Sequence, residues 1–140
     1  AIAYPDFKLH YMNVGFGSNR YKMQPVFVVN DKHFIYTMET VWVLPDQTNI
    51  PSHTLLTGKF RDSSVDSIIN LVHSTADSAI NRSANVLSGS ATYISVETGR
   101  KKLTFNLYNT SDSTAENILN ILSTYIPKEI NNLYISKYED

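Results

Sequence analysis

The chain contains no cysteine, and this absence excludes disulfide bonds, thiolate metal sites and cysteine nucleophiles together. It also lacks a strong charge of either sign, because twelve Lys and Arg residues oppose thirteen Asp and Glu residues and leave a net charge of −1. We therefore expect no direct binding of nucleic acid, which needs basic side chains around its phosphates. No apolar run approaches the roughly 20 residues that span a bilayer, so we also expect no membrane insertion.

The residue types that carry catalysis or metal binding are present, but they are not spaced for it. Four histidines occur, and none lies in a close spacing such as H-x-x-x-H, which places two imidazoles on one face of a helix. The sequence also lacks G-x-G-x-x-G and G-x-S-x-G motifs, which favour nucleotide binding and hydrolase chemistry. We therefore predict a protein that is not an enzyme, with no catalytic residues, no metal site and no cofactor.

A length of 140 residues suits one domain with one hydrophobic core, and we predict a single domain over residues 1–140. Two units, each a hairpin followed by a helix, make up most of the chain. The first unit spans about residues 24–80 and the second spans residues 91–126. Before them, residues 7–12 alternate between apolar and polar and predict a first strand, which ends at the glycines of residues 15–17.

The first unit begins with strands over residues 26–29 and 34–38, which we predict to pair across the turn at residues 30–32. Both faces of this hairpin are apolar, a pattern typical of central strands that are covered on both faces. A long loop with two prolines then leads through a short apolar piece into a helix. We predict Ser63 as the N-cap of this helix and apolar positions up to Ile80 as its inner face. Residues 81–90 are predicted to be a loop.

The second unit contains a hairpin whose turn we place at Thr98 and Gly99, so that Val96 pairs with Lys101. Three consecutive cations follow, at residues 100–102. A run of this kind at a strand is typical of a solvated sheet edge, where it discourages the addition of another strand.

A capping box at residues 113–116, with Ser113 as the N-cap and Glu116 as its partner, predicts the start of the second helix. Pro127 ends that helix. The tail over residues 130–138 fits either a short helix or a last strand, and we favour the helix slightly.

These elements predict an α+β fold, with a twisted and mainly antiparallel sheet built from two hairpins and an N-terminal strand. Two principal helices are expected to pack on one face of that sheet. Whether the two units arose by duplication is left open, because their residues do not align closely.

Tyrosine is the residue type that points to a contact surface. Nine tyrosines, six phenylalanines and one tryptophan exceed what one modest core requires, and tyrosine suits sites that are apolar at one end and wet at the other. The alternative is that several rings pack on the sheet. The candidates for display are Tyr4, Tyr11, Tyr21, Tyr93, Tyr108, Tyr134 and Tyr138.

The long loop over residues 45–53 is a second candidate contact region, because long loops often carry function. It contains Asp46 and His53, where a general base is one possibility and a surface contact element is the other. Taken together, our candidates for binding a partner are Asp46, His53, Asp62, Tyr134, Tyr138, Glu139 and Asp140.

A small, cysteine-free α+β domain with a near-neutral charge, many amphipathic aromatics and no catalytic constellation resembles the bacterial immunity proteins. These proteins neutralise secreted toxins, notably the toxins of contact-dependent growth inhibition. The resemblance covers size and element order and includes no shared motif, so it assigns no functional residue. It implies a cytoplasmic protein that binds one cognate toxin, often a nuclease. Because the surface of such a nuclease is basic, acidic residues of the immunity protein would be expected to face it.

Two alternatives stay open beside this hypothesis. The first is an exported or lipid-anchored domain of the cell envelope or periplasm with a structural or ligand-binding role, which the lack of an initial methionine slightly favours. The second is a small hydrolase that uses His53 together with Asp46 or a neighbouring carboxylate.

Overall fold

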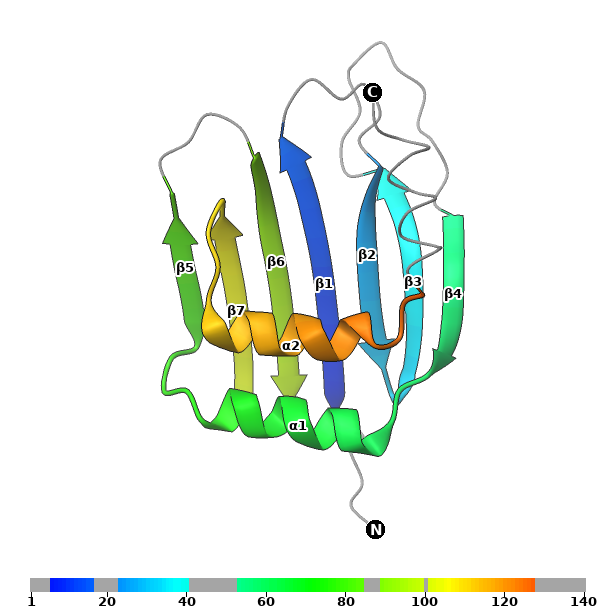
Figure 1. Ribbon diagram of the computed structural model, residues 1–140. Coiled ribbons are helices and arrows are strands. Elements are labelled where there is room, and N and C mark those ends of the chain that lie inside the picture. The colour runs from blue at the N-terminus through cyan, green and yellow to red at the C-terminus, as the bar shows by residue number, and fades with distance from the viewer. Residues whose placement is uncertain (1–5, 17–22, 41–52, 85–88, 100, 128–140) are drawn as a thin grey trace.

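The computed structural model describes residues 6–16, 23–40, 53–84, 89–99 and 101–127, which form one seven-stranded sheet and two helices (Figure 1). The strands lie side by side in the order β4-β3-β2-β1-β6-β7-β5, so β1 is at the centre. In chain order the elements are β1 (Phe7–Phe16), β2 (Met23–Asn30), β3 (His33–Thr40), β4 (His53–Lys59), α1 (Asp62–His73), β5 (Ala79–Ser83), β6 (Gly89–Thr98), β7 (Lys101–Tyr108) and α2 (Ser113–Ser123).

The arrangement confirms the predicted α+β fold class. Each neighbouring pair of strands is antiparallel except β5 and β7, which are parallel. Both helices lie on the same face of the twisted sheet, as Figure 1 shows. Neither helix is long and apolar enough to cross a membrane, and no other helix occurs in the described residues.

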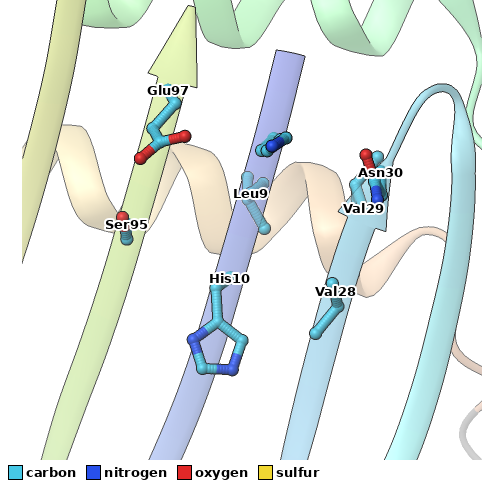
Figure 2. Close-up of a pocket in the computed structure, with 8 residues that line it drawn as sticks. Leu9, His10, Val28, Val29, Asn30, Ser95 and Glu97 are labelled. Carbon is cyan, nitrogen blue, oxygen red and sulfur yellow. The ribbon is translucent and has the colours of Figure 1, made fainter. Parts of the chain in front are cut away.

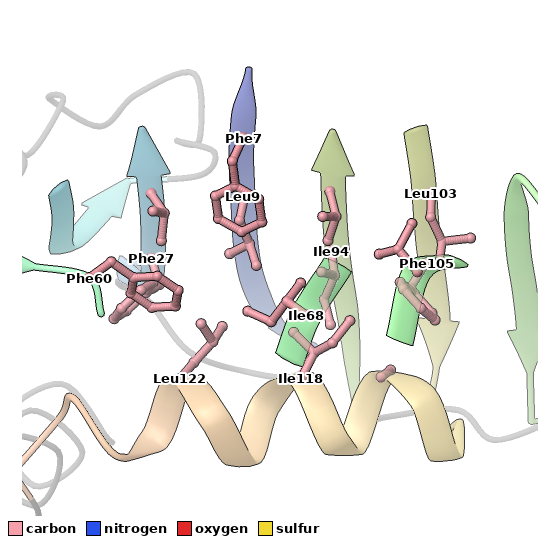
Figure 3. Packing of buried hydrophobic residues seen from close by; sticks show 14 of the residues in the cluster. Phe7, Leu9, Phe27, Phe60, Ile68, Ile94, Leu103, Phe105, Ile118 and Leu122 are labelled. Carbon is pink, nitrogen blue, oxygen red and sulfur yellow. The ribbon is translucent and has the colours of Figure 1, made fainter. Parts of the chain in front are cut away.

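The hydrophobic core fills the space between the sheet and the two helices (Figure 3). Leu9 of β1, Phe27 of β2 and Phe105 of β7 meet Ile68 of α1 and Ile118 of α2 there, and each of these side chains is at most 1% exposed. Complete burial of one such side chain contributes about 1.5–3 kcal/mol to stability. Because successive side chains of a strand point to opposite faces, every second residue of the central strands reaches this core.

The first hairpin forms as predicted, and its strands are longer than the sequence indicated. Asp31 and Lys32 are its two loop residues, and both have positive φ angles, of 51° and 66°. Two successive positive φ angles characterise the type I′ turn, which matches the twist of a hairpin. The expectation that both faces of this hairpin are covered holds only in part, because on the face opposite the helices Val26 is 3% exposed whereas Ile35 is 47% exposed.

The first strand is also longer than predicted. The structure continues β1 through Gly15 to Phe16, which pairs with Gly89 of β6. Ten residue pairs join β1 to β6, and this long antiparallel ladder outweighs the tendency of glycine to end a strand.

The region around α1 differs from the prediction in three places. The apolar piece before the helix is an edge strand, β4, which pairs with β3. The N-cap of α1 is Arg61, which makes no side-chain capping bond, and Ser63 lies inside the helix. The helix ends at His73, and Ile80, predicted to be helical, lies in β5 opposite Phe105 of β7. Ile80 reaches the core from this strand, so pairing with β7 outweighs the helical spacing of the segment.

The second hairpin has a register different from the predicted one. Thr98 pairs with Lys101, and Val96 pairs with Leu103. The loop begins at Gly99, whose φ of 59° is easy for glycine because it has no Cβ atom. The register moves by two residues, so each side chain stays on its predicted face.

The cations of this hairpin do not mark a sheet edge, because β5 covers the outer side of β7. Arg100 lies outside the described residues. The two others point to opposite faces: Lys101 donates through Nζ to the backbone oxygen of Thr75 at 2.5 Å, and Lys102 pairs with Glu97.

Asp112, not Ser113, is the N-cap of α2. Its Oδ2 atom accepts from the backbone N–H groups of Thr114 at 3.0 Å and Ala115 at 3.1 Å. Its Oδ1 atom pairs with the guanidinium of Arg82 at 3.2 Å. A carboxylate suits this position better than a hydroxyl, since it serves two helix donors and a cation at once. The tail over residues 130–138, predicted as helix or strand, lies outside the described residues.

Candidate functional site

The face of the sheet opposite α1 and α2, which we call the open face, is the candidate functional site. Its side chains come from alternate positions of the strands, and the pairing register places them in rows across the sheet. Its exposed and half-exposed side chains include Lys8, His10, Met12, Val28, Asn30, His33, Ile35, Thr37, Thr57, Lys59, Tyr93, Ser95, Glu97, Lys102, Thr104, Asn106 and Tyr108.

Large apolar side chains are exposed at two places in the described residues, and both places are on the open face. Ile35 of β3 is 47% exposed and Tyr108 of β7 is 39% exposed. Most of the other large apolar side chains of the strands point to the helices and are buried. The exposed apolar surface of the described residues is therefore concentrated on one face.

Tyr108 is paired with Tyr93 on this face. Their hydroxyl oxygens lie 2.9 Å apart, and their rings meet edge to face with centroids separated by 6.2 Å. The hydrogen bond to Tyr108 raises the pKa of Tyr93. The pair presents fixed aromatic surface with polar tips, a combination that suits contact with another protein.

The other tyrosines predicted for display have different positions. Tyr11 is on the helix side of β1, where it packs against the core, and burial raises its pKa to about 12. The prediction that Tyr11 is displayed is therefore wrong. Tyr4, Tyr21, Tyr134 and Tyr138 lie outside the described residues.

A pocket of about 270 Å³ lies at the centre of the open face, on strands β1, β2 and β6 (Figure 2). Its polar lining consists of Lys8, His10, Asn30, Ser95 and Glu97. Lys8 stands between Asn30 on one side and Glu97 on the other, and His10 stands opposite Ser95. The register of three neighbouring strands, rather than closeness in sequence, brings these groups together.

The charges in this pocket are not fully paired. Glu97 Oε1 lies 3.4 Å from Lys102 Nζ. Lys8 makes no ion pair with any described residue, and its side chain is exposed. Lys8 therefore offers a cation that a ligand or partner can use.

Ser95, His10 and Glu97 have the residue types of a hydrolytic triad, but their arrangement does not have the required geometry. No hydrogen bond joins these side chains to one another, whereas a triad needs a nucleophile bonded to its base. Both β1 and β6 have neighbouring strands on both sides, so their N–H groups serve the sheet and are not available as an oxyanion hole. The pocket is better suited to binding than to acyl transfer.

The residues predicted for partner binding are not brought together by the described structure. Asp62 begins α1 on the other face of the sheet and pairs with Lys32 at 3.2 Å. His53 is the first residue of β4, opposite Met38. Asp46, Tyr134, Tyr138, Glu139 and Asp140 lie outside the described residues, so the proposed role of these seven positions stays a prediction.

The pocket of the open face had a signal in the sequence, although the residues that line it were not singled out. Lys8 and His10 alternate with core residues in β1, and Ser95 and Glu97 do so in β6. Such alternation shows that the residues share a face. The order of the strands in the sheet decides which of these residues are neighbours, and that order produces the pocket.

A second pocket, of about 470 Å³, lies beside the start of α2 and has mainly polar walls that include Arg82 and Asp112. Asp112 is engaged there by two helix N–H groups and by Arg82. Arg82 and Asp112 therefore already satisfy one another, and we assign this pair a structural role at the start of α2.

Among the described residues, no group of three or more His, Asp or Glu side chains is placed to hold a metal ion. Comparison with known proteins adds no assignment, since neither a protein-family model nor a curated protein matches the chain.

Proposed function

We propose that this chain is a non-enzymatic binding domain that contacts another protein through its open face. The observation that carries the proposal is that both exposed large apolar side chains of the described residues, Ile35 and Tyr108, lie on the face opposite α1 and α2. A face that displays apolar and aromatic side chains among polar ones has the composition of a protein interface.

The tyrosine pair supports a protein partner in particular. Binding energy in interfaces is concentrated in a few side chains, and tyrosine is among the commonest of them. Tyr93 and Tyr108 hold each other in place through their hydroxyls, so less side-chain entropy is lost when a partner covers them.

The immunity role remains our specific form of this proposal, and the open face constrains which toxin it would fit. Lys8, Lys59 and Lys102 are on that face, and Glu97 is its acidic side chain among those described. A surface with this charge pattern suits an acidic patch on the partner better than the basic surface of a nuclease.

The proposal can be tested by capture experiments with a matched pair of variants. Ile35→Asp places a charge at one of the two exposed large apolar side chains of the open face, and Asn70→Asp places the same charge on the exposed side of α1. We expect a partner retained stoichiometrically by the wild-type chain to be lost with Ile35→Asp and kept with Asn70→Asp. Circular dichroism of both variants verifies that they are folded.

A second variant, Tyr108→Ala, removes one ring of the tyrosine pair. If this ring is a binding hot spot, its loss weakens binding by about 2 kcal/mol, which is about thirtyfold in Kd. A partner that binds the folded Ile35→Asp and Tyr108→Ala variants as tightly as the wild type would contradict the assignment of the open face.

A further inference from the structure

We infer that the pocket at the centre of the open face binds a carboxylate, supplied by an acidic side chain of the protein partner. This inference rests on the proposed function and specifies it, because it names the chemistry by which a partner is anchored. The observation behind it is that Lys8, which makes no ion pair with a described residue, lines a pocket together with Asn30, Ser95 and His10.

The hydrogen-bonding groups in the pocket fit a carboxylate. Lys8 supplies an ammonium group, Asn30 an amide N–H and Ser95 a hydroxyl, while the His10 ring adds a donor in either tautomer. A carboxylate has two oxygens and accepts about four hydrogen bonds, so it can satisfy several of these donors at once. Glu97 is directed to Lys102, which leaves Lys8 for the incoming group.

The size of the pocket favours a side chain over a larger ligand. Pockets for small molecules usually measure about 300–1,000 Å³, and this one, at about 270 Å³, is below that range. A single Glu or Asp side chain entering from a protein surface needs little space. The rest of the partner then lies over the open face, where Ile35 and the tyrosine pair are exposed.

The charge pattern disfavours a nucleic acid as the source of the anion. A phosphate backbone brings several charges at once and needs a row of cations, whereas this pocket contains one lysine beside the acidic Glu97. The chain as a whole also has a net charge of −1. A single side-chain carboxylate brings one charge, which matches the one lysine of the pocket.

The test is a titration of the ¹⁵N-labelled full chain with a blocked Gly-Glu-Gly peptide, which carries a single carboxylate, followed by NMR at low salt. We expect the largest shift changes at the amides of residues 8–10, 28–30 and 95–97. Lys8→Gln is expected to weaken this binding about tenfold, because it removes the charge-assisted bond. The matched control, Lys59→Gln, removes an equal charge from the same row of the open face but outside the pocket, and is expected to change binding by less than about twofold.

Several results would overturn the inference. Shift changes spread over all lysine-bearing surfaces, or equal losses with Lys8→Gln and Lys59→Gln, would show general charge attraction. Tighter binding of inorganic phosphate than of the peptide at the same amides would replace the carboxylate by a phosphate.

The inference and the proposed function fail in distinguishable ways. Capture of the partner that depends on Ile35 but not on Lys8 would refute the carboxylate pocket and leave the open face as the interface. Peptide binding that depends on Lys8, together with partner capture that does not depend on Ile35, would refute the open face and leave the pocket as an anion site.

Discussion

The hydroxyl of Tyr125 links the segment that follows α2 to the start of α1, and we predict that Tyr125→Phe destabilises the fold by about 2 kcal/mol. Its oxygen accepts from the backbone N–H of Arg61 at 2.9 Å and lies 2.7 Å from the Ser64 hydroxyl. Arg61 is the N-cap of α1 and makes no side-chain capping bond of its own. In a capping box, a side chain in the first turn bonds the N–H of the N-cap residue. Here a tyrosine 64 residues away in sequence does so.

The magnitude follows from what the substitution removes and what it keeps. Each hydrogen bond contributes about 0.5–1.5 kcal/mol net, and a buried hydroxyl left without a partner adds a desolvation cost. Ser64 is 6% exposed, so it is in the second situation. The ring of residue 125 would remain stacked on Phe60, with centroids 4.6 Å apart and planes inclined by 21°. The loss is therefore confined to the hydroxyl.

Urea denaturation followed by far-ultraviolet circular dichroism measures this loss directly. In thermal melts we expect Tm to fall by about 8 °C, at about 4 °C per kcal/mol for a domain of this size. Tyr108→Phe is the matched control, since it removes an exposed hydroxyl of the open face and is expected to cost less than about 0.5 kcal/mol. Equal destabilisation by the two substitutions, or none by Tyr125→Phe, would refute the capping role of Tyr125.

Three further predictions concern the cap of α2, a crowded glycine and a buried tyrosine. Asp112→Ala is expected to lower the free energy of unfolding by about 1–2 kcal/mol and Ser113→Ala by less than about 0.5 kcal/mol, as denaturant midpoints will show. Gly58→Ala places a Cβ atom 2.7 Å from Cε1 of Phe34, so we expect a loss of about 1–3 kcal/mol in the same assay. Burial raises the pKa of Tyr11 from 10.0 to about 12, so ionisation opposes folding. The stabilisation that neutral Tyr11 provides is complete below pH 10. As the pH rises from 10 to 12, the free energy of unfolding is expected to fall by about 3 kcal/mol, and Tyr11→Phe should remove this part of the pH dependence.

Patterns that depend on neighbours in sequence predicted most of the secondary structure. The apolar residues of the first hairpin alternate with a period of two, and the two-residue turn at Asp31 and Lys32 is close to the predicted site. The inner positions of both helices, such as Ile68 and Ile118, were also correctly predicted from their spacing. These features are local, and the physical preference that produces them can be read from a short segment.

The features that were predicted incorrectly are those in which a distant partner decides between local alternatives. Ser113 and Asp112 are both good N-cap residues, and Arg82 of β5 adds a reason for the aspartate. The helical spacing was predicted to run to Ile80 and residues 81–90 were predicted as a loop, but residues 79–83 form β5, because the free side of β7 offers backbone hydrogen bonds that a longer α1 or a loop does not use. The register of the second hairpin likewise depends on a two-residue loop that begins at Gly99.

The candidate site shows the same limit, because its residues come from three strands that are separated in sequence. Lys8 precedes Asn30 by 22 positions and Glu97 by 89, yet the ladders of β1 place it directly opposite both. A search for sequence motifs does not detect such a set of residues. Residues that meet across a sheet can be separated by any number of positions in the sequence, so they have no characteristic spacing. Once the strand order is known, the same residues form one pocket, whose lysine makes no ion pair with a described residue. The strand order also explains why the four histidines gave no motif. His10 contributes to a pocket through the neighbours of β1 in the sheet, so its chemistry depends on Ser95 and Glu97 and not on another histidine.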